Sequence, residues 1–149
     1  MMRWVALIVM FVALPTAAQR PLNYEKDTAV IETATGQRHT VNVELAVTPD
    51  QMAQGLMYRR QLAPDAGMLF IYPAPEPAAF WMKNTLIPLD MLFIAADGRI
   101  LNIAERTIPL SETPVPAAGP VKAVLELNGG TTARLGIKSG DRVRHKSLP

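Results

Sequence analysis

The chain has 149 residues, a length that suits one ordinary domain and leaves little room for a second. Apolar residues make up 49% of it and charged residues only 19%, which excludes a wholly disordered chain. The formal net charge of +2 is too close to balance to indicate a nucleic-acid-binding protein. Cysteine is absent, so disulfides, thiol catalysis, zinc–cysteine sites and iron–sulfur clusters are all excluded.

The first eighteen residues have the pattern of a secretory signal peptide. Arg3 supplies a positive charge, residues 4–14 form an unbroken apolar run, and Pro15 precedes the small residues of 16–18. The apolar run is shorter than the roughly 20 residues that a membrane-spanning helix needs. The sequence therefore predicts a signal peptide over 1–18, a periplasmic or secreted protein, and no stable membrane span after cleavage.

Residues 19–27 are polar and are expected to form a flexible leader, with a single β domain over residues 28–149. A short apolar run over 29–31, a Thr-Gly turn and alternating apolar residues over 41–47 predict a β-hairpin. A capping box that begins at Thr48 then predicts a brief helix ending at Gly55.

The rest of the chain alternates between short apolar runs and turn residues. An Asp-Gly pair at 97–98 predicts a hairpin turn, and residues 131–135 have room for one or two helical turns. Strands are expected at six further runs: 68–72, 80–82, 89–95, 99–104, 121–127 and 142–144. This pattern predicts a mainly β fold, either a compact antiparallel sandwich or a small barrel, with one or two short helices.

Catalytic motifs are scarce. The sequence has no P-loop, no Rossmann glycine pattern and no nucleophile elbow. The two histidines, His39 and His145, lie in polar surroundings and are expected to be exposed structural residues. Asp90 interrupts an apolar strand, so it is either a general acid or base, or, as we favour, a structural carboxylate that holds Lys83 or a backbone amide.

The mature chain contains five methionines, which raises the question of copper(I) binding by soft sulfur ligands. They are spread over several expected elements, and methionine is a common filler of irregular cores. Core packing is therefore the favoured interpretation, and no metal site or cofactor is assigned. The residues concerned are Met52, Met57, Met68, Met82 and Met91.

The most distinctive segment is 80–90, in which a polar Lys-Asn-Thr stretch is bracketed by large apolar residues. Such a segment suits an opening that binds a sugar or another polar ligand. The alternative is a plain turn between two core strands, in which the polar side chains satisfy their own backbone. The candidate ligand-binding residues are Trp81, Lys83, Asn84 and Asp90, together with Arg59.

Several motifs resemble the DUF192 family, a domain of unknown function. They are Gln54–Met57 with Arg59, Met68–Phe70, Phe80–Thr85, Ile87–Asp90, Asp97-Gly98, Leu125–Leu127, Gly136–Lys138 and Gly140-Asp141. The resemblance spans about residues 28–144 and implies a mainly β single domain, often behind a signal peptide in bacteria. It implies no activity and transfers no catalytic residue. Many relatives have cysteines where this chain has Pro109–Pro120, so their absence argues against thiol chemistry here.

Two functions therefore remain open. The favoured one is a small periplasmic module that binds a polar small molecule, a glycan or an envelope protein. The alternative is a hydrolase of envelope carbohydrate or peptide, with Asp90 or another carboxylate as general acid or base. Methionine-based copper binding is a third and weaker hypothesis.

The signal-peptide prediction has a direct test. Expression of the full chain with an active export system should yield a mature protein that begins at Gln19. Intact-mass measurement of the exported protein checks this. An N-terminus that retains residues 1–18 would contradict the prediction.

Overall fold

The structure is a computed structural model that describes residues 22–149. The expected signal peptide lies outside the described residues, as does the start of the expected leader. The leader ends earlier than expected, because the first strand already begins at Glu25. Within residues 22–149, no helix has the length and apolar character needed to cross a membrane.

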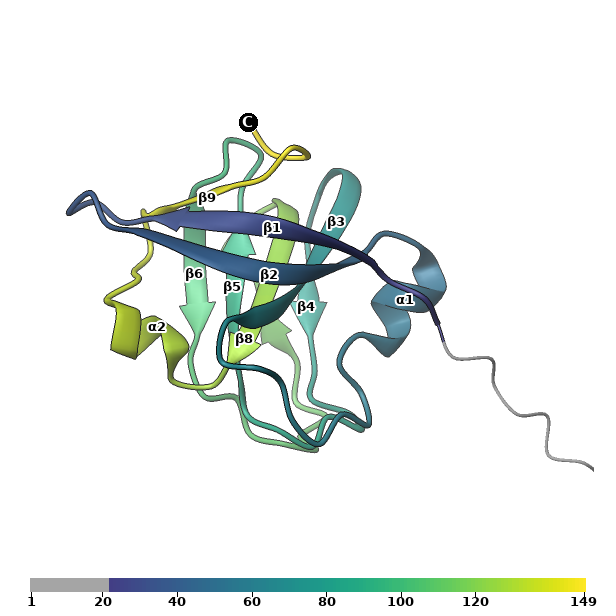
Figure 1. The fold of residues 1–149 in the computed structure, drawn as a ribbon. Coiled ribbons are helices and arrows are strands. Elements are labelled where there is room, and N and C mark those ends of the chain that lie inside the picture. The colour runs from purple at the N-terminus through teal and green to yellow at the C-terminus, as the bar shows by residue number, and fades with distance from the viewer. Residues whose placement is uncertain (1–21) are drawn as a thin grey trace, which may run out of the picture.

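Seven strands form one sheet that curls into a nearly closed barrel, which confirms the mainly β, barrel-like prediction (Figure 1). Their order is β6-β5-β8-β3-β2-β1-β9. The strands β4 and β7 form a separate two-stranded ribbon. The strands are β1 (Glu25–Glu32), β2 (Arg38–Ala46), β3 (Ala66–Glu76), β4 (Ala79–Phe80), β5 (Leu89–Ile94), β6 (Ile100–Ala104), β7 (Val115–Pro116), β8 (Val121–Asn128) and β9 (Arg142–Arg144). The two short helices are α1 (Pro49–Gln54) and α2 (Thr131–Leu135).

The barrel is drawn together at one end by β9. This short strand pairs with β1, while Arg142 bridges to Arg99 next to β6. The backbone N–H of Ile100 also donates to the carbonyl of Asp141 over 2.8 Å. Both edges of the sheet therefore meet at β9.

Local sequence signals account for most of these elements. The β1–β2 hairpin turns at Gly36, and α1 has both hydrogen bonds of the predicted capping box around Thr48. Strand pairing differs from the antiparallel expectation at one place, because β2 and β3 run parallel. The connection between them contains α1, and a crossover of this length is what a parallel pair requires.

The barrel sheet separates two apolar layers. Aliphatic side chains such as Val43, Leu69 and Leu125 fill the barrel interior. A second layer on the outer face of β3, β8 and β5 is rich in methionine and aromatic residues, among them Met68, Phe70, Met91 and Phe93. As a result β8 is buried on both faces over most of its length, although polar and apolar residues alternate along part of it.

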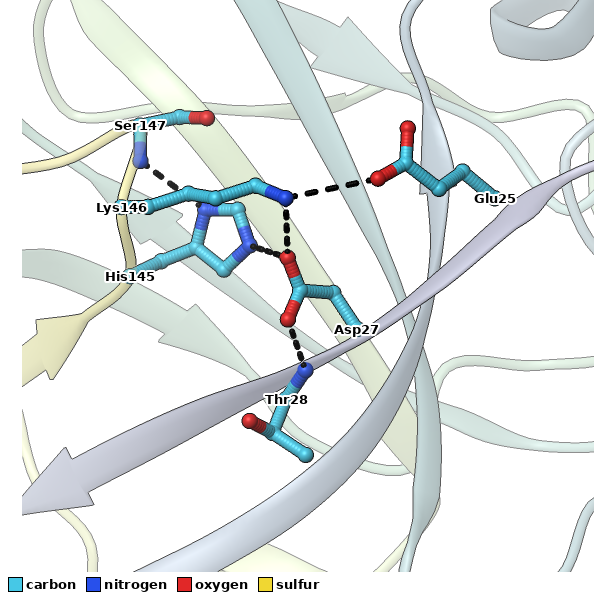
Figure 2. A network of polar contacts seen from close by, with 6 residues as sticks. All are labelled: Glu25, Asp27, Thr28, His145, Lys146 and Ser147. Carbon is cyan, nitrogen blue, oxygen red and sulfur yellow. Dashed lines mark hydrogen bonds and ion pairs between the residues drawn. The ribbon is translucent and has the colours of Figure 1, made fainter.

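The C-terminal tail folds back on β1, which corrects the expectation that His145 is exposed (Figure 2). The His145 side chain is only 1% exposed, and its Nε2 lies 3.3 Å from the Asp27 carboxylate. The Ser147 backbone N–H donates to Nδ1 over 3.1 Å, so the ring is fully engaged. Lys146 binds Asp27 at 2.7 Å and holds the pKa of that carboxyl at about 2. This network fixes the tail against β1.

Asp90 joins two segments to the middle of the sheet. Its side chain is completely buried and accepts backbone hydrogen bonds from Arg106, Gly130 and Thr132 at 2.8–2.9 Å. The Thr132 hydroxyl donates a fourth bond over 2.7 Å. All four donors belong to the loop after β6 or to the start of α2. The structural interpretation of Asp90 is therefore favoured. Its partners are backbone amides and the Thr132 hydroxyl, and not Lys83.

Replacing Asp90 by Asn should destabilise the fold strongly. An amide has only one acceptor oxygen, so its NH₂ group would face buried N–H donors, and each unsatisfied donor costs roughly 1–3 kcal/mol. Denaturant unfolding of a protein that comprises residues 19–149 checks this. A loss of less than about 1 kcal/mol in the free energy of unfolding, the size of an average substitution, would contradict the structural role of Asp90.

Candidate functional site

Three loops meet at one end of the barrel and bring most of the predicted site residues together. The Tyr58 backbone N–H donates to the Asn84 carbonyl over 2.8 Å, and the Asn84 amide donates to the Tyr58 hydroxyl over 2.9 Å. The Met82 N–H donates to the Ser111 carbonyl over 2.8 Å. The loops that follow α1, β4 and β6 are thus tied into one rim.

Trp81 and Lys83 lie on this rim. Trp81 is 47% exposed, and the Lys83 ammonium lies 5.0 Å from the centre of its indole ring. Lys83 also forms an exposed ion pair with Glu112 at 3.5 Å. The predicted neighbours Trp81, Lys83 and Asn84 therefore share one surface, with Asn84 acting as a loop clamp.

Arg59 and Asp90 have other roles. The Arg59 guanidinium makes a two-pronged ion pair with Glu44 of β2, at 2.5 and 3.1 Å, and lies 5.8 Å from the centre of the Tyr24 ring. Asp90 is enclosed by its four donors. Asp90 is therefore not available to a ligand. The Arg59 side chain is 31% exposed but does not line the cavity described below, so it stands apart from Trp81, Lys83 and Asn84.

A cavity of about 230 Å³ opens beneath Trp81, between α1 and the outer face of the sheet. Most of its lining residues are apolar or aromatic, but polar atoms form nearly half of the exposed wall, and one carboxyl group is among them. The lining residues are Met52, Ala53, Gln54, Gly55, Leu56, Met57, Phe70, Tyr72, Ala79, Phe80, Trp81, Thr85 and Glu126. Trp81 on the rim of this cavity was among the predicted site residues, whereas Phe70 and Glu126 at its base were not.

Glu126 is the charged residue on that lining. It lies in the middle of β8, opposite Met68 of β3 and Met91 of β5, and is 4% exposed. Among residues 22–149 its carboxyl group has no hydrogen-bonding or ion-pairing partner. Burial alone raises its pKa to about 8. A carboxyl in such surroundings holds a proton at neutral pH and is a group that functional sites often contain.

The backbone keeps Glu126 in place. Gly67 lies on the adjacent strand, where an added Cβ would come within 2.6 Å of the Glu126 carbonyl oxygen. The two strands are therefore in close contact at this register. The pattern that indicated Asp90, a carboxylate inside an apolar strand, is present at Glu126 as well, but Glu126 was not among the predicted site residues.

Nearby cations are engaged elsewhere. Lys122, on the same strand, donates to the carbonyl oxygens of Tyr72 and Pro73 at 2.6 and 2.9 Å. Lys83 pairs with Glu112, and Arg59 with Glu44. The described residues therefore place no counter-ion beside Glu126.

The methionines divide into two groups. Met68, Met82 and Met91 are buried in the outer apolar layer, and the Met82 sulfur accepts a hydrogen bond from the Thr107 hydroxyl. Met52 and Met57 are partly exposed and line the cavity. Within the described part of the chain, no group of three or more His, Asp or Glu residues has the arrangement of a metal site. Core packing thus accounts for the three buried thioethers, and Met52 also packs against this layer.

Backbone strain is concentrated in the same loops. The non-glycine residues with positive φ in residues 22–149 are Tyr58, Asn84, Arg106 and Leu110, with φ from 46° to 66°. Asn tolerates this region, but each of the other three costs on the order of 1–3 kcal/mol. Leu110 donates its N–H to the carbonyl of Thr85, a cavity residue, over 3.1 Å. Residues with this left-handed backbone therefore occur in all three loops of the cavity rim.

Glu126 should make the protein less stable as the pH rises. Its pKa is higher in the fold than in the unfolded chain, so its favourable contribution is complete below pH 4.5 and is lost as the pH rises towards 8. The loss is on the order of 4 kcal/mol. Glu126→Gln, which cannot ionise, should therefore be more stable than the parent at pH 8.5 and similar to it at pH 4.5.

Denaturant unfolding of both proteins at the two pH values checks this. Glu105→Gln serves as the matched control, because Glu105 is exposed and lies outside the cavity. An equal pH dependence in the parent and Glu126→Gln proteins would contradict the assignment.

Comparisons with known proteins agree with this architecture. A crystal structure from Sinorhizobium meliloti 1021, of a protein assigned only provisionally as a transcription regulator, is 51% identical, with a TM-score of 0.84, covering 87% of this chain and 100% of its own. A protein of unknown function from Novosphingobium aromaticivorans DSM 12444 is 44% identical, with a TM-score of 0.80, covering 90% and 91%. A search of curated proteins gave no match. The DUF192 family model, described as "Uncharacterized ACR", matches residues 30–145. The chain therefore belongs to the DUF192 family.

Proposed function

We propose that the protein is an exported module that binds a small ligand in the cavity beneath Trp81. The observation that carries the proposal is the cavity itself, with apolar and aromatic walls and one buried, unpartnered carboxyl group at Glu126. Ligand sites are typically concave and mostly apolar, with a few polar groups that orient the ligand. The unpaired carboxyl has a free-energy cost to the fold, and a ligand that satisfies it would recover that cost.

The walls narrow the kind of ligand expected. A sugar or another wholly polar molecule would leave its hydroxyl groups facing Phe70, Phe80 and the two methionine side chains. A compact molecule with an apolar body and one polar group matches the lining better. The export part of the proposal rests on the sequence of residues 1–18 alone.

Acid catalysis is a second candidate, favoured by one observation. Glu126 has a raised pKa and an apolar environment, which is the condition that keeps a catalytic carboxyl protonated at neutral pH. The hydrolase hypothesis therefore passes from Asp90 to Glu126. Turnover of a cavity ligand that is lost in Glu126→Gln would favour the enzyme over the binding module.

The binding proposal is tested on the mature protein, in which Trp81 is the only tryptophan. A screen of small molecules of all charge types should give hits that move the Trp81 indole N–H resonance and raise the thermal midpoint. A ligand at one hundred times its dissociation constant adds about 2.7 kcal/mol to the stability.

Two tryptophan substitutions localise the hits. Ala53→Trp places a large ring at the cavity rim from an exposed position of α1 and should abolish binding. Ala34→Trp, in the exposed β1–β2 turn, should leave binding unchanged. Hits that persist in Ala53→Trp, or a screen without hits, would overturn the proposal.

A further inference from the structure

We infer that the cavity binds an organic cation and that Glu126 is its counter-ion. The cation would be an ammonium group on a compact apolar body. This inference rests on the proposed function. Glu126 is 4% exposed and lines the cavity, next to Met68 and Met91 of the adjacent strands and beneath the segments that cover the sheet. A buried carboxylate needs a partner of opposite charge. The described residues supply none, so the ligand is the remaining source of positive charge.

The titratable groups that face this region supply no counter-ion to Glu126. From β3, the Tyr72 phenol has its pKa raised by burial, by Glu76 and by Glu126, so it stays neutral. From β8, Lys122 is held by backbone carbonyls, and on the rim Lys83 is paired with Glu112. Met68 and Met91, the paired residues on the neighbouring strands, are uncharged.

Aromatic walls favour a cation over a neutral guest. Phe70, Tyr72, Phe80 and Trp81 all line the cavity, and Phe70 and Phe80 meet edge to face at 5.0 Å. The faces of such rings attract ammonium groups, and a carboxylate beside aromatic rings is a common way to bind methylated amines. The Lys83 ammonium already lies 5.0 Å from the centre of the Trp81 indole ring.

Size limits the ligand to a small molecule. Engineered apolar cavities of about 150 Å³ hold benzene. The cavity of about 230 Å³ therefore has room for one ring with a small cationic group. An anionic guest would be repelled by Glu126 once this carboxyl ionises.

Binding of such a cation is coupled to release of the Glu126 proton. Because the pKa of Glu126 is about 8, the ionised form that binds the cation makes up about 1% of the free protein at pH 6 and half of it at pH 8. The affinity for a permanently charged cation should therefore rise about 50-fold between these pH values.

The experiment uses benzyltrimethylammonium, whose charge does not depend on pH, against its neutral isostere neopentylbenzene and the anion phenylacetate. The fluorescence of Trp81 in the mature protein reports binding at pH 6, 7 and 8. We expect benzyltrimethylammonium to bind best, with the 50-fold gain in affinity towards pH 8. Neopentylbenzene should bind more weakly than the cation at pH 8 and should gain no affinity between pH 6 and pH 8.

Variants assign the effect to Glu126. Glu126→Gln should remove the pH dependence and weaken benzyltrimethylammonium at pH 8, while neopentylbenzene binds as before, which shows that the cavity is intact. Glu105→Gln should behave like the parent.

The inference is overturned if the neutral or the anionic probe binds at least as well as the cation at pH 8, or if the cation binds without pH dependence. It is equally overturned if none of the three probes binds while the broader screen finds cavity ligands. In each of these cases the binding function stands. If the screen also fails, both proposals fail together.

Discussion

Burial of the central strands on both faces is the constraint on which the rest of the structure depends. Barrel side chains cover one face of β3, β8 and β5, and a methionine-rich and aromatic layer covers the other. A polar side chain on either face must therefore find partners inside the protein or stay uncharged. Asp90 and Glu126, on neighbouring strands, meet this constraint in opposite ways. Asp90 has four donors, whereas Glu126 is protonated and lines a cavity.

Much of the fold is predictable from local sequence because its signals act over a few residues. The capping box at Thr48, the Gly36 turn and the Asp-Gly turn at 97–98 depend on spacing alone. The parallel pairing of β2 with β3 does not, because it depends on where the chain returns after α1. Nor does the second apolar layer, since α1 and the β4-β7 ribbon cover the sheet from distant parts of the sequence. Alternation along β8 therefore gives no indication that Glu126 is buried.

The same distinction explains the candidate site. Trp81, Lys83 and Asn84 are close in sequence, and their shared place on one rim was predictable. Arg59 belongs to a pair with Glu44, and His145 to a network with Asp27, and both partners are remote in sequence. The floor of the cavity required knowledge of which strand lies beneath Trp81. A carboxylate between two apolar residues indicates a buried carboxyl group. It does not show whether that group has hydrogen-bonding partners, as Asp90 does, or lacks them, as Glu126 does.

The central claim is that Glu126 is a buried carboxyl without a partner. A ¹³C-detected NMR titration of the glutamate side-chain carboxyls in the mature protein tests this claim most directly, with Glu126→Gln used to assign the resonance. The account predicts that the Glu126 carboxyl titrates near pH 8 in the free protein. A midpoint near 4.5, the ordinary value for a solvated glutamate, would contradict it.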